Sequence, residues 1–285
     1  MKSLCINVGC SFTTTDYHEN TYGYTPEDFA YWGQIVANQL GLKHMNYAKS
    51  GAGSDRHLYD LTRAIADHGT DIELILIGWS GWDRFSYPYA SGVLTVCPPT
   101  AYHEEAYDHD YEMFIMSRKK YPKKLYQSAI HQAYTNMYAC VQLAKTVNAK
   151  LIIFQMLKPT NIIHTWLGQT LEKKRWGSFL SRERQTALWE VIANSSSYDK
   201  LEEEESLMGF PFLRELGGYP LWDLLHENYK REDLTINKPL EKAKYFVNRD
   251  VVEIQKHAGM DFHPGAFGHA KIAEKVLEHY EKVYK

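Results

Sequence analysis

The sequence lacks a long hydrophobic run and an excess of charge of one sign. No apolar run approaches the roughly 18 residues of a membrane-spanning helix, and Met1 leads straight into a strand-like run without the regions of a signal peptide. These absences predict a soluble, intracellular protein, cytoplasmic and without a membrane partner. The net charge of -3 over 285 residues gives no global basic excess, so nucleic acid is not an expected partner.

Cysteine is also scarce, and no pair has Cys-x-x-Cys spacing. Cys5 and Cys140 stand in apolar periodic stretches, which predicts buried free thiols. Cys10 is the neighbour of a candidate nucleophile, but a reactive thiol needs an electropositive setting. The segment 103–110 contains His, Glu and Asp in a loop-like stretch without a recognised metal-ligand spacing. We therefore expect no metal site in this segment.

Aromatic residues are abundant instead, with 21 Tyr and 7 Trp. These side chains combine an apolar ring with a polar tip, which suits a surface that faces carbohydrate or a partner. An aromatic-rich core explains the same composition equally simply.

Strands alternate with helices along the chain, which predicts a parallel sheet with right-handed crossovers. Strands are expected at about 3–9, 43–47, 73–78 and 150–155, and helices at about 26–41, 55–68, 123–148 and 270–284. The expected fold is one α/β domain over residues 1–285, a three-layer α/β/α sandwich with a mainly parallel sheet of about five strands.

Two segments interrupt this alternation, at about 84–122 and 157–250. The first is rich in Tyr, Pro and His and is expected to form an ordered loop or a small subdomain. The second contains a predicted helix at 179–193 and the acidic run Glu202–Glu205, expected to be a solvated helix face. Insertions at the active edge of a sheet commonly act as lids or specificity elements.

A short motif stands where the first strand ends, Gly9–Thr13, with Ser11 at its centre. In open α/β sheets ligands bind at the carboxyl edge, where a serine beside backbone N–H groups can act as a nucleophile next to an oxyanion site. A tight turn with Ser11 as a helix cap remains open. Some 250 residues later, Asp261 and His263 precede the terminal helix and have the chemistry of an orienting carboxylate and a base.

The motif Gly9–Thr13 resembles the Gly-Asp-Ser-Leu block of the SGNH (GDSL-like) hydrolases, with Cys10 in place of Asp. Asn46–Gly51 resembles their second block, and Gly51 matches its glycine. The third block normally reads Gly-x-Asn-Asp after a strand, and in Gly78–Gly81 it is Ser80 that stands at the Asn position.

The segment Asp261–Pro264 resembles the last block of the family. The family usually spaces its last block Asp-x-x-His, whereas Asp261 stands only two positions before His263, with Met260 at the expected place. The four blocks occur in the family's order, and three of them fall at the ends of expected strands.

The resemblance implies an SGNH- or flavodoxin-like fold and an ester hydrolase without a cofactor. It implies Ser11 as nucleophile, His263 as base and then acid, and Asp261 as the orienting carboxylate. The backbone N–H groups of Ser11 and Gly51, with the Ser80 hydroxyl, would bind the oxyanion.

The expected substrate is a small-molecule or glycoconjugate ester, for instance an O-acetylated carbohydrate, with acyl transfer as a variant of the reaction. The replaced Asn and the short Asp–His spacing motivate a second hypothesis, a binding or assembly protein that kept the scaffold but has little or no activity. No particular oligomeric state is predicted.

Overall fold

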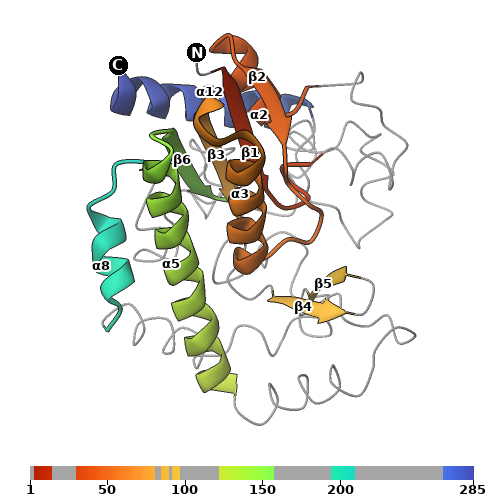
Figure 1. Ribbon diagram of the computed structural model, residues 1–285, viewed down its shortest axis with the longest axis vertical. Coiled ribbons are helices and arrows are strands. Elements are labelled where there is room, and N and C mark those ends of the chain that lie inside the picture. The colour runs from red at the N-terminus through yellow and green to blue at the C-terminus, as the bar shows by residue number, and fades with distance from the viewer. Residues whose placement is uncertain are drawn as a thin grey trace, which may run out of the picture.

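Figure 1 shows the computed structural model of the chain. The structure describes residues 3–14, 30–80, 85–89, 92–96, 122–156, 194–208 and 266–285. No helix within these ranges is long and apolar enough to cross a membrane.

The central sheet has five strands, all parallel, in the order β2-β1-β3-β6-β7. This confirms the predicted parallel α/β architecture and its number of strands. The first residues of β1 and β3 lie at one edge of the sheet. At the other edge, Gly9, the last residue of β1, pairs with Gly78, the last residue but one of β3. The strands are β1 (Leu4–Gly9), β2 (Lys43–Asn46), β3 (Ile72–Trp79), β6 (Lys150–Gln155) and β7 (Leu207–Met208).

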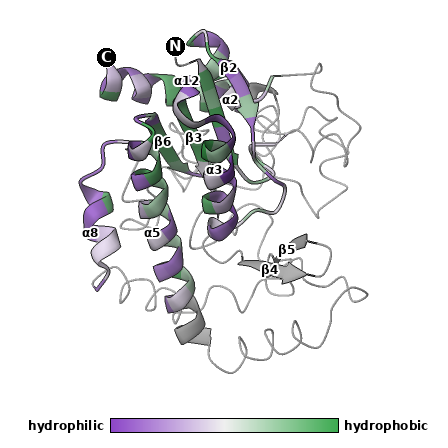
Figure 2. Ribbon diagram, viewed as in Figure 1, coloured by the Kyte–Doolittle hydropathy of each residue, from purple (hydrophilic) through white to green (hydrophobic). Residues whose placement is uncertain are grey.

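Helices cover both faces of the sheet, which gives the three layers (Figure 1). On one face lie α3 (Ser54–His68), α5 (Pro122–Thr146) and α8 (Ser196–Glu202). On the other face lie α2 (Trp32–Gln39) and α12 (Ala266–Tyr284), which pack against each other. The central strands are hydrophobic along their length (Figure 2), as expected for a sheet that is buried on both sides.

The pleat of β1 divides its side chains between two cores. Leu4, Ile6 and Val8 pack with α3 and α5, whereas Cys5 packs with α2 and α12. The predicted buried free thiols are confirmed for Cys5 and Cys140, and burial raises the pKa of the Cys5 thiol to about 12. These thiols are therefore protonated and unreactive at neutral pH.

Two predicted helix boundaries were wrong. Helix α2 begins at Trp32, because Tyr31 is extended, with φ -77° and ψ 153°. The start signal at 25–28 lies outside the described residues. Helix α5 ends at Thr146, two residues early, and Asn148 then adopts a positive φ of 52°, which turns the chain toward β6.

The two insertions contain elements that the sequence analysis did not specify. Within 84–122, β4 (Phe85–Tyr89) and β5 (Gly92–Val96) form an antiparallel hairpin. The segment 157–250 supplies α8 and the fifth strand, β7. The acidic run was expected on a helix face, but α8 ends at Glu202, and Glu203 is already its C-terminal cap.

Candidate active site

The candidate nucleophile lies in a tight turn directly after β1. The carbonyl of Cys10 accepts hydrogen bonds from the backbone N–H groups of Thr13, at 2.8 Å, and Thr14, at 3.2 Å. Ser11 is the first residue inside this turn and is 5% exposed. The turn fixes the Ser11 backbone at the carboxyl edge of the sheet, between the ends of β2 and β3.

Two paired glycines make room for this turn. A Cβ atom on Gly9 would lie 2.3 Å from Thr13 Oγ1 and 2.7 Å from Thr13 Cβ, and a Cβ on Gly78 would lie 2.7 Å from Thr13 Oγ1. The fully buried Thr13 side chain therefore occupies the space over the last residues of β1 and β3. Glycine is required at both positions because the turn folds back onto the strand ends.

A side chain at the end of β2 joins this turn to the next loop. Asn46 donates from Nδ2 to the carbonyl of Thr13, at 3.2 Å, and its Oδ1 accepts from the backbone N–H of Ala48, at 3.0 Å. One carboxamide thus satisfies a group in each of the two segments, so the turn of Ser11 and the loop after β2 keep a fixed spacing.

The loop between β2 and α3 contains Gly51, the predicted backbone donor to the oxyanion. Gly51 has a φ of 79°, a conformation that favours glycine. The N–H of Lys49 donates to the carbonyl of Gly9, at 3.0 Å, and that of Ala52 to the carbonyl of Lys49, at 3.1 Å. These bonds place the loop against the end of β1, next to the turn of Ser11.

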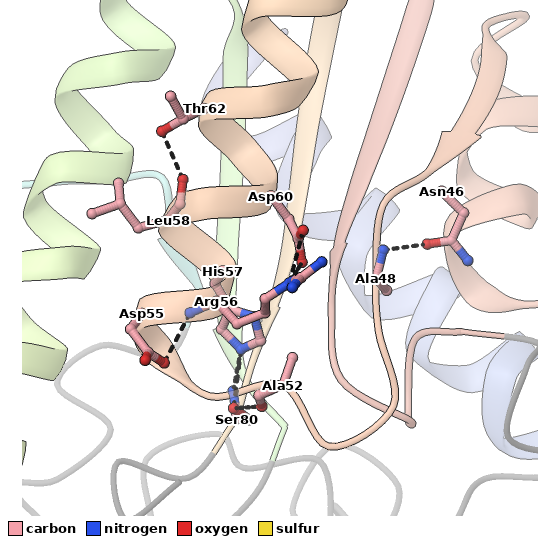
Figure 3. Close-up of polar contacts among 10 residues, drawn as sticks. All are labelled: Asn46, Ala48, Ala52, Asp55, Arg56, His57, Leu58, Asp60, Thr62 and Ser80. Carbon is pink, nitrogen blue, oxygen red and sulfur yellow. Dashed lines mark hydrogen bonds and ion pairs between the residues drawn. The ribbon is translucent and has the colours of Figure 1, made fainter. Parts of the chain in front are cut away.

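Ser80, the predicted side-chain donor to the oxyanion, is bonded through each of its polar atoms. Its hydroxyl donates to the carbonyl of Ala52, at 2.6 Å, and lies 3.0 Å from His57 Nε2 (Figure 3). Its N–H points to the same ring nitrogen, at 3.2 Å, and its carbonyl accepts from Gln155 Nε2, at 3.0 Å. Contacts with the loop before α3, with α3 and with β6 therefore fix Ser80, the residue that follows β3.

An ion pair lies next to these residues on α3. Arg56 Nε donates to both carboxylate oxygens of Asp60, at 3.0 and 2.9 Å, and its guanidinium stacks over the exposed ring of Tyr59. Burial raises the pKa of Asp60, and the hydrogen bonds from Arg56 oppose this shift. Within the described ranges, no cluster of three or more His, Cys, Asp or Glu side chains could hold a metal ion.

Asp261 and His263 lie outside the described residues, so their predicted roles stay predictions. The helix that follows them does reach the site. On α12, the buried ring of His269 packs on Tyr31 with centroids 4.5 Å apart, and its Nδ1 lies 3.5 Å from the N–H of Trp32. The indole N–H of Trp32 in turn donates to the carbonyl of Phe12, at 3.2 Å.

Sequence patterns did not indicate His57, Gln155 or the roles of Thr13 and Asn46. A signal existed for His57, since it stands four residues before Leu61 on the stripe of α3 that faces the core. A histidine at a core position needs a buried hydrogen-bond partner. For Gln155, the last residue of an otherwise apolar strand, no sequence pattern indicated a partner.

No protein-family model matches the chain, and no curated protein sequence matches it. Among solved structures, the chain is similar to the protein YxiM from Bacillus subtilis, with 13% identity, 99% of this chain covered and a TM-score of 0.47. The match spans 57% of that protein's length.

Two other similar structures have lipase or esterase names. One is a GDSL-like lipase from Bacteroides thetaiotaomicron, with 13% identity, a TM-score of 0.43, and 99% of this chain and 89% of that one covered. The other is the psychrotrophic esterase EstA from Pseudoalteromonas sp., with 12% identity, a TM-score of 0.40, and 98% and 97% covered. The fold assignment rests on the strand order and register described above.

Proposed function

We propose that the chain is a serine hydrolase of the SGNH type that cleaves an ester bond, with Ser11 as the nucleophile. The observation that carries this proposal is the turn Cys10–Thr13, seated over Gly9 and Gly78 at the carboxyl edge of two central parallel strands. A serine in such a turn lies beside the loop of Gly51, and ligands bind at this edge in open α/β sheets.

The proposed base is His263, oriented by Asp261. Its support is the path of contacts from α12 to the turn of Ser11, in which His269 lies against Trp32, and Trp32 donates to the carbonyl of Phe12. Helix α12 begins at Ala266, three residues after His263. In the sequence, the proposed base therefore comes directly before a helix that is anchored next to the turn of Ser11.

In the proposed reaction, Ser11 Oγ attacks the ester carbonyl carbon and its proton passes to His263. The tetrahedral intermediate collapses as the C–O bond of the leaving alcohol breaks, and His263 returns the proton to the alkoxide. Water then attacks the acyl-enzyme with His263 as base, which releases the acid and restores Ser11.

The negative oxygen of the intermediate would be bound by the backbone N–H groups of Ser11 and Gly51 and by the Ser80 hydroxyl. The last contact requires a rearrangement, because the single hydroxyl proton of Ser80 is donated to Ala52 in this structure. The Ser80 side chain would have to rotate about its Cα–Cβ bond, so that the hydroxyl proton leaves the Ala52 carbonyl and is donated to the oxyanion.

We propose a polar O-acyl substrate such as an acylated carbohydrate. The composition supports this choice, because β4 (Phe85–Tyr89) contains three aromatic residues and the chain has 21 Tyr and 7 Trp in all. The hairpin follows β3 directly in the chain and lies near α3, on the side of the sheet where the strands end (Figure 1). Aromatic rings bind the apolar faces of sugars while their polar tips stay hydrated.

A second candidate function is binding without efficient catalysis. The observation that favours it is the Ser80 hydroxyl bond to Ala52, since a proton held there is not donated to an oxyanion. Loss of one oxyanion donor lowers turnover by about 10²–10³-fold in other enzymes.

Labelling with a fluorophosphonate probe tests the proposal. The purified protein should be labelled at Ser11 and should hydrolyse a short aryl ester. Ser11→Ala should abolish labelling and lower turnover by about 10⁴-fold or more, because the covalent path is lost. Ser50→Ala, at an exposed serine in the neighbouring loop, is the matched control and should keep both activities.

Two results would contradict the proposal. Folded wild-type protein that neither reacts with the probe nor cleaves the ester would leave binding as the better function. Labelling that persists in Ser11→Ala would place the nucleophile elsewhere. His263→Ala should reduce the rate of labelling without unfolding the protein, and an unchanged rate would remove His263 from the mechanism.

A further inference from the structure

His57 occupies a position where an apolar side chain is expected. It is fully buried on α3, on the same side of the helix as Leu61 and Ala64, and its ring packs edge-on against Trp79 with centroids 5.2 Å apart. A buried imidazole costs free energy unless its nitrogens are hydrogen-bonded. The hydrogen-bond partner of His57 is Ser80, which directly follows β3.

Both contacts of His57 Nε2 go to Ser80. A backbone N–H can only donate, so the 3.2 Å contact from Ser80 N uses a lone pair on His57 Nε2. The Ala52 carbonyl can only accept, so the 2.6 Å contact uses the hydroxyl proton of Ser80, and the 3.0 Å contact between that hydroxyl and Nε2 then uses a proton on Nε2. The two contacts correspond to different tautomers of the ring, and in each of them Nε2 is bonded to Ser80.

This arrangement connects two segments of the candidate site. His57 accepts the N–H of Ser80 directly after the last residue of β3, and Ser80 donates to Ala52, the neighbour of Gly51 (Figure 3). The loop of Gly51 is thereby tied to β3, in addition to its bonds to β1 through Lys49. Without His57, the buried N–H of Ser80 would lose its acceptor and Ser80 would be free to shift.

We propose that His57 is a positioning residue for the ester hydrolysis proposed above, on which this inference rests. Through Nε2 it fixes Ser80, and through Ser80 it fixes the loop whose Gly51 N–H would bind the oxyanion. His57 itself touches no substrate. Its effect is on the geometry of donors that act in the transition state, so it should appear in kcat rather than in KM.

The test compares His57→Leu, His57→Gln and a control on the same helix face, Leu61→Ala. His57→Leu removes the acceptor and should lower kcat about 10- to 100-fold with KM nearly unchanged, since small misplacements of catalytic groups have effects of this size. Gln offers an acceptor at similar reach and should recover kcat to within about fivefold of wild type. Leu61→Ala destabilises the core without touching Ser80 and should keep kcat in the folded enzyme.

Amide hydrogen exchange provides a readout that does not depend on activity. Exchange at Ser80 and in residues 47–53 should speed up in His57→Leu, return toward wild type in His57→Gln, and stay protected in Leu61→Ala under conditions where each variant is folded. This pattern, together with the loss of kcat, supports the proposal.

Two outcomes overturn it. Wild-type kcat and wild-type exchange in His57→Leu would show that the ring positions nothing. Equal loss of kcat in Leu61→Ala and His57→Leu would show an effect of general stability. If the wild-type protein has no esterase activity, the proposed function fails and the positioning role in hydrolysis fails with it, whereas the exchange data still report whether His57 holds the loop.

Discussion

The two edges of the central sheet are held by different kinds of contact. At the carboxyl edge, uncharged residues bond loops to strand ends: Thr13 and Ser80 are buried, and Asn46 is exposed. At the amino edge, Lys150 forms an ion pair with Glu73 and donates to the hydroxyl of the buried Tyr280, and both members of the ion pair are partly exposed.

This difference indicates a division between positioning and anchoring. Buried neutral hydrogen bonds have well-defined geometry and are costly to leave unmade, which suits the placing of reacting groups. Partly exposed ion pairs contribute little each and tolerate change. Substitutions at the carboxyl edge should therefore change turnover, and those at the amino edge should change stability alone.

The largest effect in this comparison is expected for the glycines under Thr13. Gly78→Ala would place a Cβ 2.7 Å from Thr13 Oγ1 and 2.9 Å from Met156 Cγ. The turn of Ser11 would have to shift, and we expect turnover of the ester to fall about 100-fold with a loss of about 1–3 kcal/mol in unfolding free energy. Kinetics and urea denaturation measure the two quantities.

A double substitution sharpens this prediction. Thr13→Ala removes Oγ1 and should rescue Gly78→Ala, because the remaining neighbour is the flexible Met156. It should not rescue Gly9→Ala, where Thr13 Cβ would still lie 2.7 Å from the new atom. Failure of Thr13→Ala to rescue Gly78→Ala would show that contact with Thr13 is not what displaces the turn.

A smaller effect on turnover is expected for Ser80→Ala. If the hydroxyl turns to the oxyanion, its loss should lower kcat about tenfold to a hundredfold, less than for a carboxamide donor, with little change in KM. Steady-state kinetics on a short aryl ester measure both. Full activity in a folded Ser80→Ala would remove Ser80 from the oxyanion site while Ser11 remains the nucleophile.

The sequence predicted the fold well because its strands are continuous apolar runs. Strands at 150–155 and 73–78 were recognisable, since a strand buried on both faces has no polar positions to obscure it. Strand β7 was missed because its two residues, Leu207 and Met208, are too few for a pattern. The start of α2 was misplaced because the extended Tyr31 packs on His269, a contact that is 238 residues away in sequence and leaves no local signal.

Part of the arrangement of the candidate site could be predicted from the sequence, but its contacts could not. The segments of Ser11 and Gly51 were expected to meet, and the structure brings them together at one sheet edge, while the roles of these residues stay predictions. The partners of Ser80 could not be derived from the chain, because His57 and Gln155 come from a helix and a strand that only the fold brings together. Local patterns report burial and periodicity, whereas a buried polar network depends on side chains that are distant in sequence.

At the amino edge, Tyr284→Phe should reduce stability without changing turnover. The Tyr284 hydroxyl accepts from the N–H of Leu151, at 3.0 Å, and donates to its carbonyl, at 2.7 Å, which joins the end of α12 to β6. Removing it should lower the unfolding free energy by about 1–2 kcal/mol, measured by urea denaturation. Tyr59→Phe, on a side chain that is 56% exposed, is the control and should be neutral.

A fall in kcat for folded Tyr284→Phe would contradict the proposed division. It would mean that the anchoring of α12 at its C-terminal end affects turnover through the N-terminal end of the same helix, where His269 contacts Trp32. The two edges would then be coupled through the helix, and stability and turnover could not be changed separately.

The smallest effect is expected for Lys150, and it should appear only at alkaline pH. The hydrogen bond to Tyr280 raises the pKa of Lys150, the contact with Glu73 adds to this shift, and partial desolvation opposes it. A raised pKa in the folded state means that the stabilisation is fully present below the unfolded pKa of about 10.4 and is lost as the pH rises through the folded pKa.

Lys150→Met should therefore show a shallower decline in unfolding free energy above about pH 10 than wild type. Lys285→Met removes an exposed pair with Glu281 and should keep the wild-type slope. Because the side chain of Lys150 is 33% exposed, added salt should narrow the difference between Lys150→Met and wild type. Urea denaturation from pH 8 to 11 measures the slope of unfolding free energy against pH. Equal slopes in Lys150→Met and wild type would show that this ion pair does not contribute to anchoring at the amino edge.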